Sequence, residues 1–316
     1  MVGCLEKLKA ELDDNKFVET KSDLSIGEMI EKICFDGIIS EPCIWPHFGL
    51  VSIHDSGSHK DMDYPLLIKS AKSITPFFHS CFEIGRAYSP NNKDRIFVIR
   101  RLGMNAESEM LKATGNINTH KGIIFLLGIL CVSLGEMFGM KRNYCSSKTD
   151  FGNLMLTQAY HGFKEEILNE IKRPHIGLSQ TYGEWVQYKY GIAGIRGLVT
   201  TNFKIIREGF RLYVNLFNRV NNKHLVLGYL RVYFLANCED TNIIKRAGIY
   251  NANKIKLLAK ESLTAGGVFT KKGIIVINEL EEWMLKNQWS AAAAGDLVII
   301  ILFMVGAYES GIIHYR

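Results

Sequence analysis

Residues 122–134 read GIIFLLGILCVSL, and residues 297–307 read LVIIILFMVGA. A helix that spans a membrane needs roughly 20 predominantly apolar residues. Lys121 and Glu136 bound the first run and Asp296 precedes the second, so both runs are shorter than that. We therefore interpret both runs as buried central helices of an all-α protein, and we expect no contact with a membrane.

Helical spacing of apolar residues also dominates the rest of the chain. Apolar residues recur three and four positions apart from Ile26 to Cys34 and again from Leu156 to Ile167. All six prolines lie in the first 174 residues, which leaves the remainder free of the strongest helix breaker. We predict roughly ten or more helices in a compact single-domain bundle over residues 1–316, with N-terminal helices within residues 1–40.

Local signals predict several element boundaries. Thr181 and Glu184 fit a capping box, which predicts a helix that begins at Tyr182. Ser290 precedes four alanines and is predicted to be the N-cap of the last helix. Residues 96–99 are expected to form a short strand.

Charge and cysteine content limit the classes of function. The 316 residues include 38 Lys and Arg against 32 Asp and Glu, a formal net charge of +6. Because the basic residues are spread along the chain, we expect small anionic ligands such as phosphates and no nucleic acid. The seven cysteines form no CxxC pair, and the charged N-terminus lacks the apolar region of a secretory signal. These features predict a cytoplasmic protein.

Residues 54–63, HDSGSHKDMD, form the first polar cluster between the helices. Asp61 and Asp63 carry the hard oxygen donors that Mg²⁺ prefers beside a phosphate. On a helix, His59 and Asp63 would share one face. The alternative is a solvated loop whose aspartates cap the next helix.

Residues 113–122, ATGNINTHKG, form the second cluster and lead into the apolar helix. The free N–H groups of a helix N-terminus and the charge of Lys121 would both favour a phosphate. Capping by Asn118 or Thr119 is the alternative, and it leaves His120-Lys121-Gly122 unexplained.

Three further segments have weaker signals. Residues 190–197, YGIAGIRG, have the glycine spacing of a turn from which one arginine projects. Asp240-Thr241-Asn242 is a helix-capping string by default, although Asp240 and Arg246 could equally bind a metal and a phosphate. Asp296 needs a partner or a metal ion if it is buried in the last helix.

Taken together and in this order, these clusters resemble the triphosphoribosyl-dephospho-CoA synthase family. The resemblance rests on five stretches of residues: 49–63 (GLVS-x-x-D-SGSHKDMD), 106–122 (AE-x-x-ML-x-ATGNINTHKG), 190–197 (YG-x-x-G-x-RG), 240–248 (DTN-x-x-x-R-x-G) and 290–297 (S-x-x-x-x-x-DL). It covers most of the chain from about Gly49 onward, and the first two stretches are the specific ones.

The resemblance implies an all-α transferase. Such an enzyme joins ATP to 3′-dephospho-CoA to form 2′-(5″-triphosphoribosyl)-3′-dephospho-CoA and releases adenine. The product is the precursor of the prosthetic group on the acyl carrier protein of citrate lyase or malonate decarboxylase. The resemblance leaves open which of these two pathways is served and whether the enzyme is an oligomer.

The resemblance also implies roles for individual residues. A general base would accept the proton of the attacking ribose 2′-hydroxyl, for which Asp61 and Glu107 are candidates, and His59 or His120 would protonate the departing adenine. Mg²⁺ would be held by Asp63, Asp240 or Asp296. The nucleotide and its phosphates would be bound by Ser56, Gly57, Lys60, Asn118, Thr119, Lys121, Gly122, Arg196, Thr241, Asn242 and Arg246.

The sequence departs from the family pattern in three places. Residues 46–53 read PHFGLVSI where the family has PKPGLVDR, and residues 196–199 read RGLV where it has RGEA. Residues 290–297 read SAAAAGDL where the family has SPGGSADL. The departures at Ser52, Leu198 and Ala291 to Ala294 motivate an alternative function, a divergent non-catalytic nucleotide-binding relative. A third interpretation is an unrelated helical interaction protein, in which the motifs would be helix caps that resemble the family only by chance.

Overall fold

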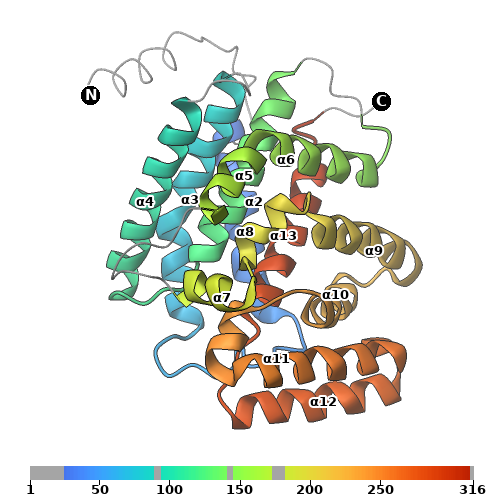
Figure 1. The fold of residues 1–316 in the computed structure, drawn as a ribbon. Helices are drawn as coiled ribbons and strands as arrows, with labels where there is room; N and C mark the ends of the chain where they lie inside the picture. The colour runs from blue at the N-terminus through green and yellow to red at the C-terminus, as the bar shows by residue number, and fades with distance from the viewer. Residues whose placement is uncertain (1–24, 89–93, 141–144, 173–181, 314–316) are drawn as a thin grey trace.

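The computed structural model describes residues 25–88, 94–140, 145–172 and 182–313. Within them the chain forms twelve α-helices and two short 3-10 turns and no strand (Figure 1). The all-α prediction is confirmed. The elements are α2 (Ile26–Ser40), η1 (Glu41–Cys43), α3 (Tyr64–Ala87), α4 (Asp94–Thr114), α5 (Lys121–Gly139), α6 (Lys148–Lys172), α7 (Tyr182–Tyr190), α8 (Gly194–Thr200), α9 (Lys204–Val220), α10 (Lys223–Asn237), α11 (Thr241–Thr264), η2 (Gly267–Phe269), α12 (Lys271–Lys286) and α13 (Ala292–Glu309).

The two apolar runs lie in α5 and α13, which pack against each other in the core. α5 also contacts α3, α4 and α6, and α13 contacts α2, α9 and α10. The helices have 19 and 18 residues, longer than the runs, so by length and composition both could cross a membrane. Their apolar windows are 78% and 67% buried inside the fold, and this burial confirms that they are central helices.

Two local predictions are wrong. Residues 96–99 belong to α4, because Arg95 and Ile99, one helical turn apart, both face the core. Ser290 is not the N-cap of α13, which begins at Ala292 and has Ala291 at the cap position without a side-chain hydrogen bond. Tyr182 is helical, as predicted, but the predicted helix start there is not tested, because Thr181 lies outside the described residues.

The segment between α2 and α3 is fixed by two charged residues from distant helices. Arg231 of α10 is fully buried, pairs with the carboxylate of Glu41, and donates hydrogen bonds to the carbonyls of Ile44 and Pro46. Glu281 of α12 accepts hydrogen bonds from the backbone N–H groups of His47 and Phe48, at 2.6 and 3.0 Å. Residues 41–48 therefore hold the start of the polar loop at 49–63 in one place.

We predict that Arg231→Met lowers the free energy of unfolding by about 3–5 kcal/mol, because it leaves the Glu41 carboxylate buried without its partner. Urea denaturation measures this change. Lys32→Ala is the control, since it removes an ion pair whose side chains are 61% and 50% exposed, and its effect should be much smaller. Equal losses in the two variants would contradict this account of the segment.

We also predict that stability falls as the pH drops from about 6.5 toward 4. Burial, and then the charge of Arg231, lower the pKa of His47 to about 4 in the folded protein. The unfolded chain binds this proton near pH 6.5, so the stabilisation is complete above that pH and is lost below it. Unfolding free energies at several pH values should have a shallower slope in His47→Leu than in the wild type, whereas an unchanged slope would contradict this role.

Candidate nucleotide site

The first polar cluster meets α11 and the α12–α13 connection. His59 Nε2 lies 3.0 Å from Ser290 Oγ, and His59 Nδ1 lies 3.4 Å from Arg246 Nη2. Arg246 Nη1 donates to the carbonyls of Ser58 and Gln288. Asn242 Nδ2 donates to the carbonyl of Ser290 at 3.1 Å. Three segments that are far apart in the sequence are thus joined by side-chain hydrogen bonds.

Asp240 joins the N-termini of α11 and α13. Its Oδ1 accepts hydrogen bonds from the backbone N–H groups of Asn242 and Ile243, at 2.8 and 3.0 Å. Its Oδ2 accepts from the N–H of Ala293 at 2.8 Å. Asp240 is buried, and it occupies the capping role at α13 that the sequence assigned to Ser290.

The N-termini of α5 and α8 complete the site. A side chain at Gly122 would collide with the Asp296 carboxylate of α13 and would lie 2.7 Å from Ile195 Cδ1 of α8. A side chain at Gly194 would lie 3.0 Å from Thr241 Cγ2 at the start of α11. Each of the five predicted segments therefore contacts at least one other of them, and together they form what we call the candidate site.

The second cluster is tied to α3 and α4. Lys121 Nζ lies 2.5 Å from Glu107 Oε1 of α4, and this ion pair is partly exposed. Buried His120 contacts Ser70 Oγ of α3 through Nδ1 at 2.7 Å, and Thr119 Oγ1 lies 2.6 Å from the same hydroxyl. His120 Nε2 has no partner among the described residues.

Burial raises the pKa values of the two aspartates Asp240 and Asp296 at the site. The pKa of Asp296 is raised well above its usual value, chiefly by burial and then by the carboxylates of Asp240 and Glu41. Burial also raises the pKa of Asp240, against the effect of the three backbone N–H groups that donate to it. In the described part of the chain, the carboxylate of Asp296 has no hydrogen-bond or ion-pair partner. A cation beside Asp296 would therefore relieve an unfavourable charge.

Burial has the opposite effect on the two histidines. It lowers the pKa of His120 to about 4. Burial, and then the guanidinium of Arg246, lower the pKa of His59. Both imidazoles are therefore neutral at pH 7.

The remaining predicted residues lie around these contacts. Asp61 is 61% exposed, with Oδ1 3.8 Å from His59 Nδ1. Asp63 caps α3 by accepting a hydrogen bond from the N–H of Leu66. His59 precedes this helix, so the prediction that His59 and Asp63 share a helical face is wrong. Asn118 Oδ1 accepts from the N–H of Lys121, which fits the capping alternative. The carbonyl of Ser56 accepts a hydrogen bond from the His59 N–H, and Gly57 has a φ of +55°. Lys60 and Arg196 have no polar partner among the described residues.

Three residues at the site were missed as functional candidates: Ser70, Ser290 and Glu41. Ser70 lies in the middle of α3 and Ser290 was explained by capping, so neither has a local sequence signal. Glu41 follows Ser40 in a segment that resembles an ordinary helix end. Only the packing of α3, α5 and α13 brings these residues to the motifs.

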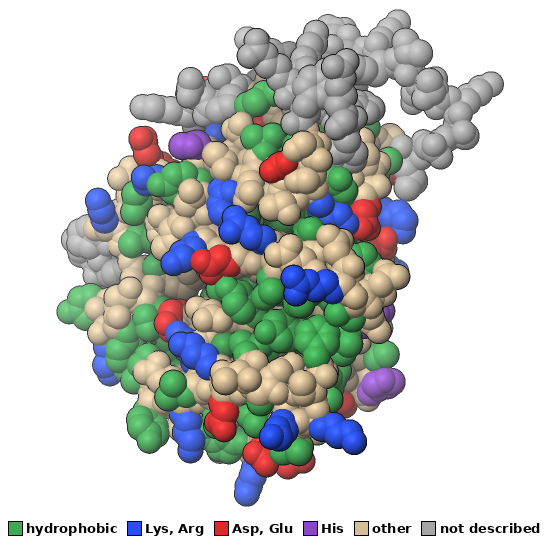
Figure 2. All heavy atoms as spheres, turned by 90° about the vertical axis from the view of Figure 1, so that its right-hand side faces the viewer, with side chains coloured by type: hydrophobic (Ala, Val, Ile, Leu, Met, Phe, Trp, Pro, Cys, Tyr) green, Lys and Arg blue, Asp and Glu red, His purple; other side chains and the backbone are tan. Residues whose placement is uncertain are grey.

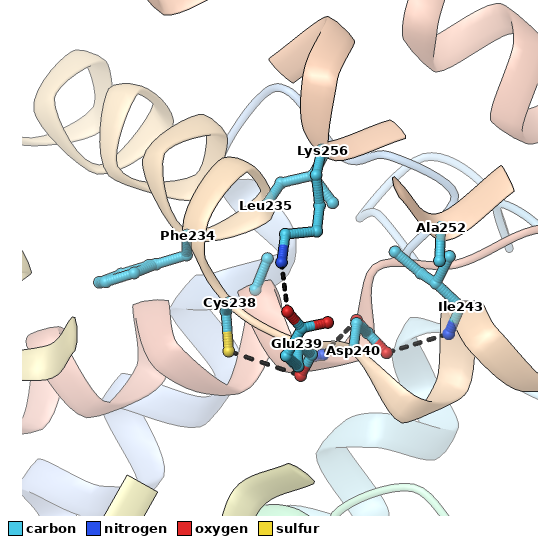
Figure 3. A pocket seen from close by; sticks show the side chains of 10 residues that line it. Phe234, Leu235, Cys238, Glu239, Asp240, Ile243, Ala252 and Lys256 are labelled. Carbon is cyan, nitrogen blue, oxygen red and sulfur yellow. Dashed lines mark hydrogen bonds and ion pairs between the residues drawn. The ribbon is translucent and has the colours of Figure 1, made fainter. Parts of the chain in front are cut away.

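A small pocket lies beside Asp240, between α10, α11 and the start of α13 (Figure 3). In this view Glu239 points toward Lys256, and Asp240 points toward the backbone of Ile243. The cavity volume is about 10 Å³, at the limit for one water molecule. This cavity is therefore too small to hold a nucleotide.

Figure 2 shows the face at the right-hand side of Figure 1, where apolar side chains gather near the centre. The described Lys and Arg side chains are scattered around them and mixed with acidic ones. On this face the positive charge does not form the continuous stripe that is typical of nucleic-acid binding.

Comparison with known proteins identifies relatives whose alignments cover most of the chain. The chain is 27% identical over 288 residues to a probable 2-(5″-triphosphoribosyl)-3′-dephosphocoenzyme-A synthase of Salmonella gallinarum, covering 90% of this chain and 92% of the relative. It is 27% identical to Protein CitXG of Haemophilus influenzae and 29% identical to Protein CitXG of Leuconostoc mesenteroides subsp. cremoris. These alignments cover 96% and 90% of this chain, and 65% and 61% of the two relatives. No solved structure matches the chain.

The model of one protein family matches residues 28–311, which include all five segments of the candidate site. That family is described as ATP:dephospho-CoA triphosphoribosyl transferase. The match does not favour a non-catalytic relative. The chain belongs to the CitG family of ATP:dephospho-CoA triphosphoribosyl transferases.

Proposed function

We propose that the candidate site binds ATP and 3′-dephospho-CoA and transfers the triphosphoribosyl group between them. The 2′-hydroxyl of dephospho-CoA attacks the anomeric carbon of the ATP ribose, the bond from that carbon to adenine breaks, and the hydroxyl proton is balanced by the proton that adenine gains. The observation that supports this proposal is that pairwise contacts connect all five segments. Carboxylates near the anomeric carbon would stabilise the positive charge that develops on the sugar.

The cations of the site would bind the triphosphate. Lys60 and Arg196 have no polar partner among the described residues, so their charges are available to a ligand. The N-terminus of α5 adds free backbone N–H groups beside Lys121, in the arrangement that favours phosphate. Asn118, Thr119, Thr241 and Asn242 would position the nucleotide through polar groups.

We propose that Mg²⁺ accompanies the triphosphate and that Asp296 is its main protein ligand. The unpartnered carboxylate of Asp296 fits this role better than Asp240, whose oxygens already accept three backbone hydrogen bonds. Asp63 would contribute only the oxygen that does not cap α3. Among the described residues no group of three or more His, Cys, Asp and Glu side chains is arranged to hold a metal ion. Phosphate oxygens and water would therefore supply most of the coordination, as is usual for Mg²⁺.

Asp61 and Glu107 remain the candidates for the general base. Asp61 is exposed and free to approach a bound substrate, whereas Glu107 is engaged with Lys121 until that lysine binds a phosphate. His120 is better placed than His59 to contact the departing adenine, because its Nε2 has no partner among the described residues. As a neutral imidazole it would donate a hydrogen bond.

In the cell, the product would be used on an acyl carrier protein of citrate lyase or malonate decarboxylase. The protein would act in the cytoplasm, without nucleic acid or membrane partners. We also propose that the chain forms one catalytic domain over residues 1–316.

The release of adenine tests the proposed reaction. Incubation with ATP, Mg²⁺ and 3′-dephospho-CoA should release adenine, measured by chromatography, only when all three are present. Lys121→Ala should reduce this rate, because it removes a cation at the α5 N-terminus. Measurable ATP binding without adenine release would instead support the non-catalytic alternative.

A substitution at Arg196 tests binding of the triphosphate. Arg196→Ala should raise the KM for ATP about tenfold, the cost of one hydrogen bond to a charged group, with a smaller change in kcat. Arg219→Ala is the matched control, because Arg219 lies in the last turn of α9, at the end that points away from α8 (Figure 1). Equal KM values in the two variants would remove Arg196 from the site.

A further inference from the structure

Ser290 is fully buried between two helices, although it caps neither of them. Its carbonyl accepts a hydrogen bond from Asn242, and its hydroxyl lies 3.0 Å from His59 Nε2. A buried hydroxyl with a single side-chain partner fixes the orientation of that partner. Ser290 therefore determines how the ring of His59 is held.

The surroundings of His59 also fix its tautomer. Arg246 Nη2 lies 3.4 Å from His59 Nδ1, and a guanidinium group can only donate hydrogen bonds. Nδ1 must then be the acceptor, so the proton is on Nε2, which donates to Ser290 Oγ. Asp61 Oδ1, the other charged group that faces this ring, lies 3.8 Å from Nδ1, beyond hydrogen-bonding distance.

Arg246 is held at three points. Its Nη1 donates to the carbonyls of Gln288 at 2.9 Å and Ser58 at 3.2 Å, and its Nη2 is directed to His59. The residue is nevertheless exposed, so part of the guanidinium group remains accessible to a ligand. An arginine fixed in this way loses less side-chain entropy when it binds a phosphate.

We propose that Ser290 and His59 are positioning residues that hold Arg246 for the polyphosphate of the nucleotide. The identity of that nucleotide as ATP rests on the proposed function. Both nitrogens of His59 are engaged in this arrangement, so His59 orients a cation and transfers no proton. Burial, and then Arg246, lower the pKa of His59, which agrees with an imidazole that is neutral at pH 7.

Substitutions at His59 separate positioning from proton transfer. His59→Ala removes the contact to Arg246 and should raise the KM for ATP about tenfold with kcat changed less than about threefold. His59→Gln has an amide N–H for Ser290 and an oxygen for Arg246 but cannot titrate near neutral pH, so it should restore the KM for ATP. Loss of kcat at unchanged KM in His59→Gln would overturn the proposal, as would an unchanged KM in His59→Ala.

Substitutions at Ser290 test the other half of the proposal. Ser290→Ala should raise the KM for ATP in the same direction as His59→Ala, and Ser290→Thr, which keeps the hydroxyl, should restore it. The double variant His59→Ala with Ser290→Ala should be no worse than His59→Ala, because the hydroxyl acts only through the ring. Additive effects would overturn the proposal. Lys286→Ala, an exposed change at the end of α12, is the control for general effects.

Equilibrium binding keeps this test independent of turnover. Calorimetry should show that His59→Ala weakens binding of ATP about tenfold and leaves binding of adenosine unchanged, because Arg246 meets only the phosphates. Equal weakening for both ligands would overturn the proposal. If the wild-type protein binds ATP but releases no adenine, the proposed function fails while this comparison still decides the role of His59. If the alanine variants do not fold, His59→Gln and Ser290→Thr decide it through their KM and kcat.

Discussion

The buried carboxylate of Asp240 is the interaction on which the site depends. One oxygen caps α11 and the other caps α13, through Ala293, 53 residues further along the chain. Because a helix N-terminus has unpaired N–H groups, a single anion can fix two helices at once. This junction places Asn242 and Arg246 on α11 beside Ser290 and Asp296 at the start of α13. The site is thus assembled from helix ends rather than from a single loop.

The surrounding frame also relies on buried charges. Arg231 of α10 pairs with Glu41, and Arg95 of α4 pairs with Glu136 of α5. A buried ion pair adds little net stability, but the loss of one partner is costly, so each pair acts as a constraint on packing. The Arg231 pair has a direct consequence for the site, because it fixes the segment that leads into the polar loop. Asp296, by contrast, keeps an unpartnered carboxylate at a cost in stability, which is typical of a functional position.

Sequence patterns predicted the helical class and both central helices, and they located the five polar segments. Each of these features depends on residues that are close together in the chain. Residues 96–99 were wrongly assigned to a strand because β-branched residues outweighed the period set by Arg95 and Ile99. The cap of α13 was wrong because Asp240, a distant residue, outcompetes the local Ser290. Contacts such as His59 with Ser290, or His120 with Ser70, depend on tertiary packing and have no local signal.

The structure shows what Ser52 and Leu198, two of the residues that depart from the family pattern, contact in the fold. Ser52 accepts hydrogen bonds from the backbone N–H groups of His54 and Asp55, and Leu198 is buried, so both positions are occupied by well-packed residues.

The central claim is that this site transfers the intact triphosphoribosyl group. The most direct measurement uses ATP labelled in adenine and, separately, at the γ-phosphate. We predict that adenine is released in a one-to-one ratio with dephospho-CoA consumed, while the γ-label moves to the CoA product. Release of labelled phosphate without adenine would contradict the account.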